Sequence, residues 1–209
     1  SDLIITEDSF NSISTGIREG RGIFQKIRAI IFFYIAVNLA EALLYFGTSL
    51  ILRFNLLNIW QQVYIFMTAH SLPPFAIILG SIDKDVMKEG PRNSEDIFTK
   101  HLKIALLLFS LSLALVFYGV YFGTLYGMIP SYELNKMGYR PDFSPFGFLN
   151  PIDWAQAKAR TMLSTVALIA ECALVLSLKR TNKSVVKMIR EGDNWVMWPF
   201  ILLVPLAHI

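Results

Sequence analysis

Apolar residues fall into five blocks along this chain of 209 residues, separated by polar or charged stretches. A helix that crosses a bilayer needs about 20 mostly apolar residues, and the first four blocks meet that requirement. The fifth block stops at about 15 residues, which is below the spanning minimum and predicts an incomplete last helix. The pattern predicts an all-α membrane protein, a transmembrane helix bundle with spans at about 20–53, 58–80, 102–127, 161–178 and a truncated 195–209.

Composition supports a membrane protein rather than a soluble domain. The chain is 54% hydrophobic and only 17% charged, whereas about a quarter of the residues in a soluble domain are charged. The single cysteine, Cys172, lies inside the fourth block, so no disulfide can form within the chain. We expect it to act as a small buried hydrophobic residue.

The basic residues alternate with the apolar blocks, and this alternation predicts the topology. Cytoplasmic loops carry an excess of Lys and Arg, so the N-terminus is predicted to be cytoplasmic in a multi-pass integral membrane protein. The alternation also argues against a nucleic-acid partner. The basic clusters precede the first block (Arg18, Arg21, Lys26, Arg28), separate the second from the third (Lys84, Lys88, Arg92, Lys100, Lys103) and follow the fourth (Lys179, Arg180, Lys183, Lys187, Arg190).

A carboxylate sits near the middle of the first block. In "YIAVNLAEALLYF", residues 34–46, Glu41 follows Asn38 by three positions, so both lie on one face of a helix. A charged side chain at the bilayer centre costs about 2.5–3.5 kcal/mol on insertion scales, and such residues commonly mark ion pathways. Oxygen donors suit a hard cation, so a cation site is predicted here. The alternative role is a hydrogen bond that joins two helices.

The second block predicts a helix that breaks in mid-membrane. His70 is followed closely by Pro73 and Pro74, and proline removes backbone donors from the helix. The carbonyls around Thr68–Ser71 are then expected to lose their helical partners, a pattern typical of an ion or substrate site. A plain proline kink with a hydrogen-bonded His70 is the alternative.

Glu171, in the fourth block, is a second intramembrane carboxylate and carries the same cost. The third block has no ionisable residue between Ile104 and Met128 and is expected to be scaffold. Its glycines at 119, 123 and 127 recur every fourth residue, which predicts close helix packing on that face.

Several stretches, in this order, resemble the C-terminal half of a type II P-type cation-transporting ATPase, with the calcium pumps as the most similar subgroup. "SDLIITEDSFNSI" resembles the last strand and turn of the phosphorylation domain, and "GIREGRGIFQKIR" the basic stalk. "VNLAE" matches the N-x-x-E of the fifth helix. The last two stretches are "SLPPFAIILGSIDKDVMKEGPR", which resembles the sixth helix and its cytoplasmic loop, and "ARTMLSTVALIAEC", which resembles the eighth helix.

The resemblance implies which residues hold the ion. The family's ion-binding positions fall on Asn38, Glu41 and Glu171, in a bundle equivalent to the family's helices five to nine, while Thr68 and His70 are added as candidate ion-site residues from the predicted break in the second span. The chain departs from the family in the sixth helix, where His70, Phe66 and Ala69 stand in place of Asp, Asn and Thr. A divalent ion prefers many anionic oxygens, so two calcium ions are not expected. The ion is left open among calcium, a proton and a monovalent cation.

The resemblance also divides the chain into two parts. Residues 1–19 are expected to be the end of the phosphorylation domain with the stalk entry, and 20–209 the cation-transport domain. The chain lacks D-K-T-G-T and T-G-D-G-x-N-D motifs, so no catalytic residue or cofactor site is expected in it. Mg²⁺, ATP and the actuator, nucleotide-binding and phosphorylation domains would belong to the full-length pump.

The predicted function is therefore the membrane part of an ATP-driven cation pump, whose partners are the transported cation and the lipid bilayer. Two alternatives remain at this point. One is a stand-alone channel or secondary transporter in which Glu41, His70 and Glu171 form a relay. The other is a non-transporting membrane subunit.

Overall fold

The computed structural model of the chain describes residues 10–52, 56–82, 86–88, 97–126, 151–179 and 197–208. These residues form helices and a few turns, with no strand among them, as the apolar pattern predicts. Four helical segments are long and apolar enough to cross a membrane: Phe10–Leu50, Ile59–Leu79, Lys100–Leu125 and Gln156–Leu178. Residues 1–9, where the resemblance places a strand, lie outside the described part. So do some of the basic residues predicted to face the cytoplasm, namely Lys84, Arg92, Arg180, Lys183, Lys187 and Arg190.

The helices, in chain order, are α1 (Phe10–Gly47), η1 (Thr48–Leu52), α2 (Ile59–Ile65), η2 (Phe66–His70), α3 (Leu72–Leu79), η3 (Val86–Lys88), α4 (Lys100–Leu125), α5 (Pro151–Lys179) and α7 (Met197–His208). Of these, η1 and η2 are π-helical and η3 is a 3₁₀ turn.

Two helices begin about ten residues earlier than predicted. The first was expected to start near Gly20 but starts at Phe10, because the intervening residues include no proline and a helical glycine costs only about 1 kcal/mol. The fourth span was expected at 161–178, whereas α5 starts at Pro151, a residue that suits the first position of a helix. Both helices thus extend beyond their apolar blocks.

The predicted break in the second span is present. The segment Ile59–Leu79 runs as α2, the π-helical turn η2 and then α3. Because Pro73 and Pro74 have no backbone N–H, the carbonyls of Ala69 and His70 lose the donors that a regular α-helix would supply four residues later. The wider π turn occurs immediately before this point, consistent with the frequent position of such turns at functional sites.

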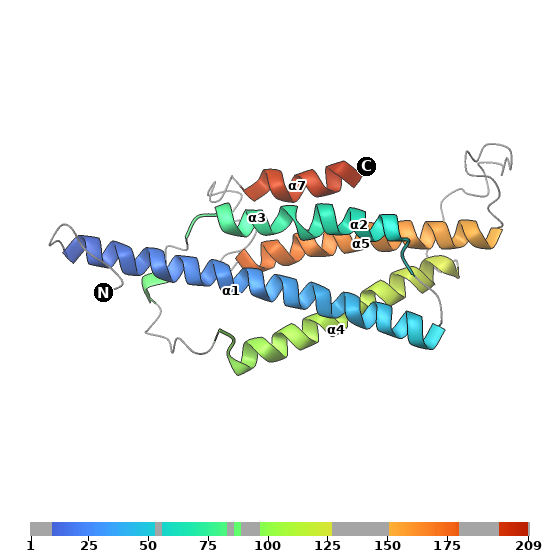
Figure 1. Ribbon diagram of the computed structural model, residues 1–209, viewed down its shortest axis with the longest axis horizontal. Coiled ribbons are helices and arrows are strands. Elements are labelled where there is room, and N and C mark those ends of the chain that lie inside the picture. Colours follow the sequence, from blue (N-terminus) through green and yellow to red (C-terminus); the bar gives the residue numbers. More distant parts are fainter. Residues whose placement is uncertain are drawn as a thin grey trace.

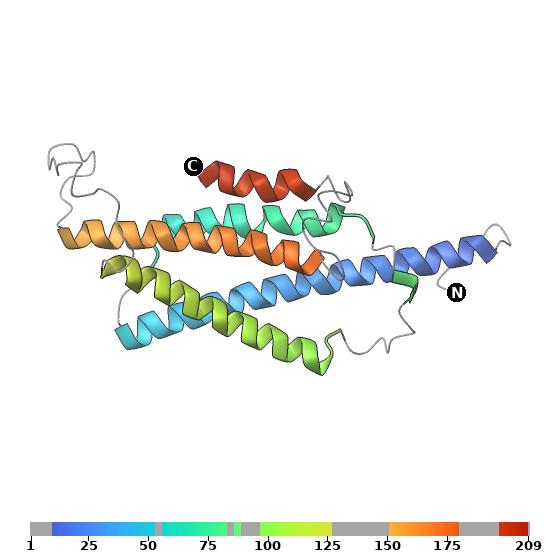
Figure 2. The same cartoon turned by 180° about the vertical axis from the view of Figure 1, so that it is seen from behind.

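α1 is the longest of the described helices and contacts α3, α4 and α5. Its N-terminal part projects beyond the other helices (Figure 1). α4 crosses α1 on one side, α5 packs against both α1 and α4, and α7 lies on α3 and α5. The view from behind shows α4 and α7 on opposite sides of the molecule (Figure 2). α5 and the broken α2–η2–α3 segment thus lie between α4 and α7 (Figure 2).

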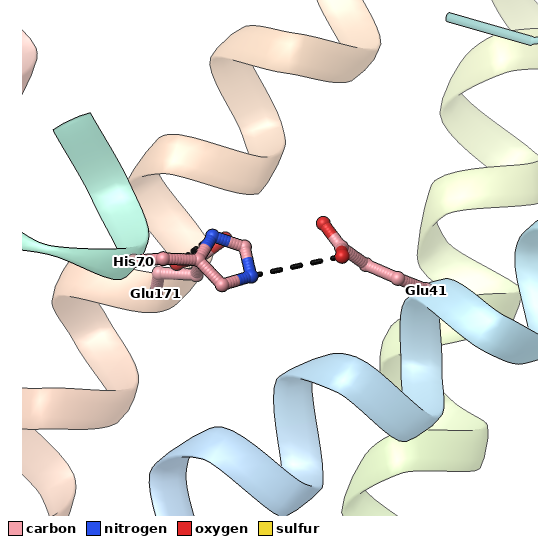
Figure 3. Close-up of side chains that lie close together, drawn as sticks. All are labelled: Glu41, His70 and Glu171. Carbon is pink, nitrogen blue, oxygen red and sulfur yellow. Dashed lines mark ion pairs between the residues drawn. The ribbon is translucent and has the colours of Figure 1, made fainter. Parts of the chain in front are cut away.

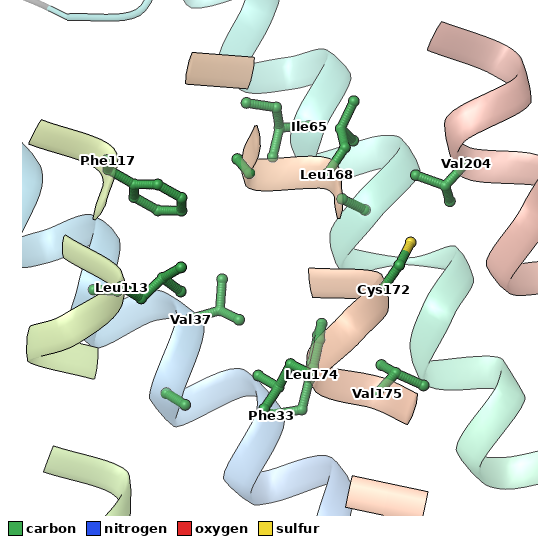
Figure 4. Close-up of a cluster of buried hydrophobic side chains, with 14 of the residues drawn as sticks. Phe33, Val37, Ile65, Leu113, Phe117, Leu168, Cys172, Leu174, Val175 and Val204 are labelled. Atoms are coloured by element: carbon green, nitrogen blue, oxygen red, sulfur yellow. The ribbon is translucent and has the colours of Figure 1, made fainter. Parts of the chain in front are cut away.

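The core is built from the apolar faces of these helices (Figure 4). Phe33 and Val37 of α1 and Phe117 of α4 are almost fully buried, with Leu168 of α5. Cys172 is buried in the same cluster and is a free thiol, as expected. Its Sγ lies 3.7 Å from the carbonyl oxygen of Ile201, so it packs at the contact of α5 with α7.

Gly119, the first glycine of the face predicted to pack on α4, is not at a packed contact, and Gly127 lies outside the described residues. A Cβ at Gly119 would meet no atom within 4 Å, and this residue is exposed. The buried side of α4 carries Ser110, Leu113, Phe117 and Tyr121 instead. Large side chains therefore fill the contact between α4 and its neighbours. A close backbone approach does occur on α1, where a Cβ at Gly47 would collide with Tyr118 Oη.

Candidate cation site

Three ionisable side chains from separate segments meet in the centre of the bundle (Figure 3). Glu41 comes from α1, His70 from η2 and Glu171 from α5. The imidazole lies between the two carboxylates: His70 Nε2 is 3.6 Å from Glu41 Oε2, and His70 Nδ1 is 3.4 Å from Glu171 Oε2. Each ring nitrogen thus faces a different carboxylate.

The three side chains of the cluster differ in their exposed fraction. The side chains of Glu171 and His70 are 1% and 5% exposed, whereas that of Glu41 is 23% exposed. His70 Nδ1 and both carboxylate oxygens of Glu171 are buried and have no hydrogen-bond partner. Buried polar groups in proteins are nearly always hydrogen-bonded, because an unpaired one costs about 1–3 kcal/mol. A bound cation, a proton or a water molecule would give these atoms the partners they lack.

The backbone of His70 is held by a contact that sequence reasoning missed. The hydroxyl of Tyr34, on α1, donates to the carbonyl oxygen of His70 at 3.1 Å. This is the carbonyl whose normal helical donor is replaced by Pro74, so the tyrosine supplies the missing bond. Tyr34 lies seven residues, two helical turns, before Glu41 and therefore on a similar face of α1. That spacing is the signal in the sequence that could have identified it.

A second hydrogen bond joins the C-terminal part of α3 to α1. Lys26 Nζ donates to the carbonyl oxygen of Ile78 at 2.8 Å, near the C-terminus of α3. Together with the Tyr34 contact, it joins η2 and the C-terminal end of α3 to α1. The position of His70 relative to Glu41 is therefore set by α1 at two points.

Two of the five predicted site residues do not join the cluster. Asn38 is exposed, and its Nδ2 donates to the carbonyl oxygen of Tyr34 at 2.7 Å. Three residues turn a helix by about 300°, so Asn38 is rotated by about 60° from Glu41, here toward the exposed side. Thr68 is half-buried, and its Oγ1 donates to the carbonyl oxygen of Tyr64 at 2.6 Å. A contribution of either residue to an ion site stays a prediction.

The three clustered side chains have the geometry and charge to hold one cation. One ligand atom from each of Glu41, His70 and Glu171 lies within 4.8 Å of the others. Two ionised carboxylates this close in a medium of low dielectric constant repel each other strongly. A positive charge between them, on a proton or a cation, is what allows both to stay ionised. Protons on such a group belong to the cluster rather than to one residue.

Comparison with known proteins identifies the family of this membrane region. Residues 54–209 match the family model described as "Cation transporting ATPase, C-terminus". The chain is 32% identical over 113 residues to human "Calcium-transporting ATPase type 2C member 1" and 28% identical over 188 residues to "Calcium-transporting ATPase 1" of Bacillus cereus. It is 34% identical over 104 residues to "Calcium-transporting ATPase" of Bacillus subtilis.

These similarities cover much of the chain but little of each relative. They extend over 53%, 88% and 49% of the chain, and over 12%, 20% and 12% of the human, Bacillus cereus and Bacillus subtilis proteins respectively. The chain therefore spans a fifth or less of the length of these relatives. What is alike is their C-terminal membrane region.

Proposed function

Because the chain belongs to the cation-transporting ATPase family, as its C-terminal membrane region, we propose that it forms the ion-binding part of an ATP-driven pump. Glu41, His70 and Glu171 are the site at which one cation or one proton is held during each cycle. ATP binding and phosphorylation take place on other domains of the full-length protein, with Mg²⁺. The relatives are calcium-transporting by name, and the ion carried by this chain is left open.

The observation that carries the proposal is that three ionisable groups converge within the bundle. Two of them have buried polar atoms without a hydrogen bond. A structural network would be expected to satisfy its members, since half-satisfied buried networks are costly. A transport site must instead be satisfied only when its ion is present, so that the ion can bind and leave. The 23% exposure of the Glu41 side chain is consistent with ion entry from that side.

The two parts of the broken span have separate roles in this proposal. The π turn η2 presents the imidazole between the two carboxylates, and two hydrogen bonds join η2 and the C-terminal end of α3 to α1. A displacement of α1 relative to α5 would then separate the Glu41 and His70 pair from Glu171. Such a separation would weaken binding and release the ion.

The test is ion-dependent phosphorylation of the full-length protein from ATP, measured across calcium, sodium, potassium and pH. Glu41→Gln is expected to abolish the dependence on the transported ion while the protein still folds, as judged by thermal unfolding. Glu19→Gln is the matched control, because Glu19 is an exposed glutamate on the same helix. A Glu41→Gln protein with unchanged ion dependence would contradict the proposed site.

A further inference from the structure

We propose that the cation taken by this site is a nitrogen-preferring divalent transition metal of the Zn²⁺ and Co²⁺ class rather than calcium. This inference rests on the proposed function, because it names the substrate class of the same site. It starts from the imidazole, which is the central member of the cluster: His70 is the residue that contacts both carboxylates.

The set of ligand atoms does not suit calcium. Ca²⁺ takes 6–8 oxygen ligands in proteins, largely carboxylates, carbonyls and water. Among the described residues the cluster offers two carboxylates and one ring nitrogen. Three neutral oxygens expected nearby are engaged or turned away, since Asn38 is exposed, Thr68 Oγ1 bonds to its own helix and the His70 carbonyl accepts from Tyr34. Imidazole nitrogen is a ligand for zinc and other late first-row metals, which accept few protein ligands.

The geometry assigns each side chain a place around the metal. The gap of 3.6 Å between His70 Nε2 and Glu41 Oε2 is too long for a hydrogen bond. It is close to the edge of about 3.4 Å expected between two ligands at tetrahedral positions with bonds of about 2.1 Å. A metal between these two atoms would also lie on the more exposed side of the cluster.

Glu171 then orients the imidazole. With the metal on Nε2, the proton of His70 stays on Nδ1, which faces Glu171 Oε2 at 3.4 Å. A small closure brings these atoms within hydrogen-bond distance and provides partners for atoms that otherwise have none. Metal-bound histidines commonly donate their second N–H to a carboxylate in this way, and loss of that carboxylate costs about 10–100-fold in affinity. The carboxylate of Glu171 is buried and its oxygens accept no hydrogen bond, which is an independent sign that a ligand binds at this cluster.

The decisive experiment compares metals on the purified full-length protein. Phosphorylation from ATP is titrated with Zn²⁺, Co²⁺ and Ca²⁺, and binding of Co²⁺ is followed by its visible absorption, which reports nitrogen ligation. We expect Zn²⁺ and Co²⁺ to act at concentrations at least about tenfold lower than Ca²⁺. His70→Asp should reverse that order, because it restores an anionic oxygen, and should remove the nitrogen signature from the Co²⁺ spectrum.

Three further variants serve as controls for this comparison. His101→Asn is the matched control, because His101 is an exposed histidine at the start of α4, and it should leave all titrations unchanged. His70→Gln removes the nitrogen ligand without adding charge, and should lose the Co²⁺ signature even if the aspartate variant fails to fold. Glu171→Gln should weaken Co²⁺ binding by about 10–100-fold rather than abolish it.

The outcomes separate this inference from the function on which it rests. If Ca²⁺ acts at lower concentrations than Zn²⁺ and Co²⁺, or if Co²⁺ gives no nitrogen signature, the metal class is wrong. The cation site itself still stands in that case, provided that Glu41→Gln abolishes ion dependence. If Glu41→Gln changes no titration with any ion, the site proposed for transport is wrong, and the metal class falls with it.

Discussion

Two buried polar regions of the bundle differ in how well their atoms are satisfied. At the contact of α1 with α4, Ser110 Oγ lies 3.0 Å from the carbonyl oxygen of Ala36 and 2.9 Å from that of Leu106. Tyr118 Oη donates to the carbonyl oxygen of Leu44 at 2.9 Å. In the cluster of Glu41, His70 and Glu171, the nearest distances between charged atoms are 3.4 and 3.6 Å, and three buried atoms have no hydrogen bond.

The difference separates packing from function. A hydroxyl group that donates to a backbone carbonyl joins two helices and leaves no polar atom of its own without a partner. In membrane proteins such bonds contribute about 0.6 kcal/mol to stability on average. Ionisable groups held apart without partners cannot be explained by helix packing alone, because they cost more than they return. The α1–α4 contact therefore serves as the internal reference for a structural interface, against which the proposed ion site is compared.

The largest effect is expected from removing the buried carboxylate of Glu171. Glu171→Met should lower the apparent affinity for the transported ion by about 100-fold in the phosphorylation assay. It should leave the midpoint of thermal unfolding unchanged or raised, since replacing a buried ionic group by an apolar one of similar size is often neutral or stabilising. A protein that loses stability and keeps its ion affinity would show that the cluster is structural instead.

The reference interface should behave in the opposite way. In Gly47→Ala the new Cβ would collide with Tyr118 Oη, so the Tyr118 side chain or the helix that carries it must shift. We expect a loss of about 1–3 kcal/mol in stability, typical of overpacking, with unchanged ion affinity in molecules that remain folded.

The double variant Gly47→Ala with Tyr118→Phe tests the cause of that loss. It removes the hydroxyl that the new methyl group meets, and should recover most of the stability. A double variant as unstable as Gly47→Ala would show that the collision is not the cause.

An intermediate effect is expected from Tyr34→Phe, which connects the two regions. It leaves the carbonyl oxygen of His70 without its donor, at a cost of about 1–3 kcal/mol. Because that bond positions the imidazole, ion affinity in the phosphorylation assay should fall along with the unfolding midpoint. Tyr126→Phe is the control, since Tyr126 is 70% exposed. An ion affinity unchanged in Tyr34→Phe would remove the positioning role of the tyrosine.

The smallest effect is expected from Ser110→Ala. It removes one hydroxyl from the α1–α4 contact, so stability should fall by about 0.6 kcal/mol, with no change in ion affinity. Thermal unfolding and the phosphorylation titration, run on the same preparation, measure both quantities. A marked change in ion affinity would mean that the reference interface is coupled to the site.

Local order along the chain is predictable because it depends on neighbours in the sequence. The number of spanning helices follows from the apolar blocks, and the break near His70 from the missing N–H groups of Pro73 and Pro74. Glu41 and Glu171 are recognisable as unusual from their cost in an apolar helix alone. The starts of α1 and α5 are less predictable, since polar residues continue a helix once it has formed.

The tertiary structure alone decides which of these groups meet. Glu41, His70 and Glu171 belong to three segments, and only the packing of α1, η2 and α5 brings their ligand atoms within 4.8 Å. Packing also turns Asn38 to the exposed side and places Tyr34 on the carbonyl that Pro74 leaves free. The physical reason is that helical spacing specifies angles around one axis, whereas the facing of two helices depends on how all their side chains fit together.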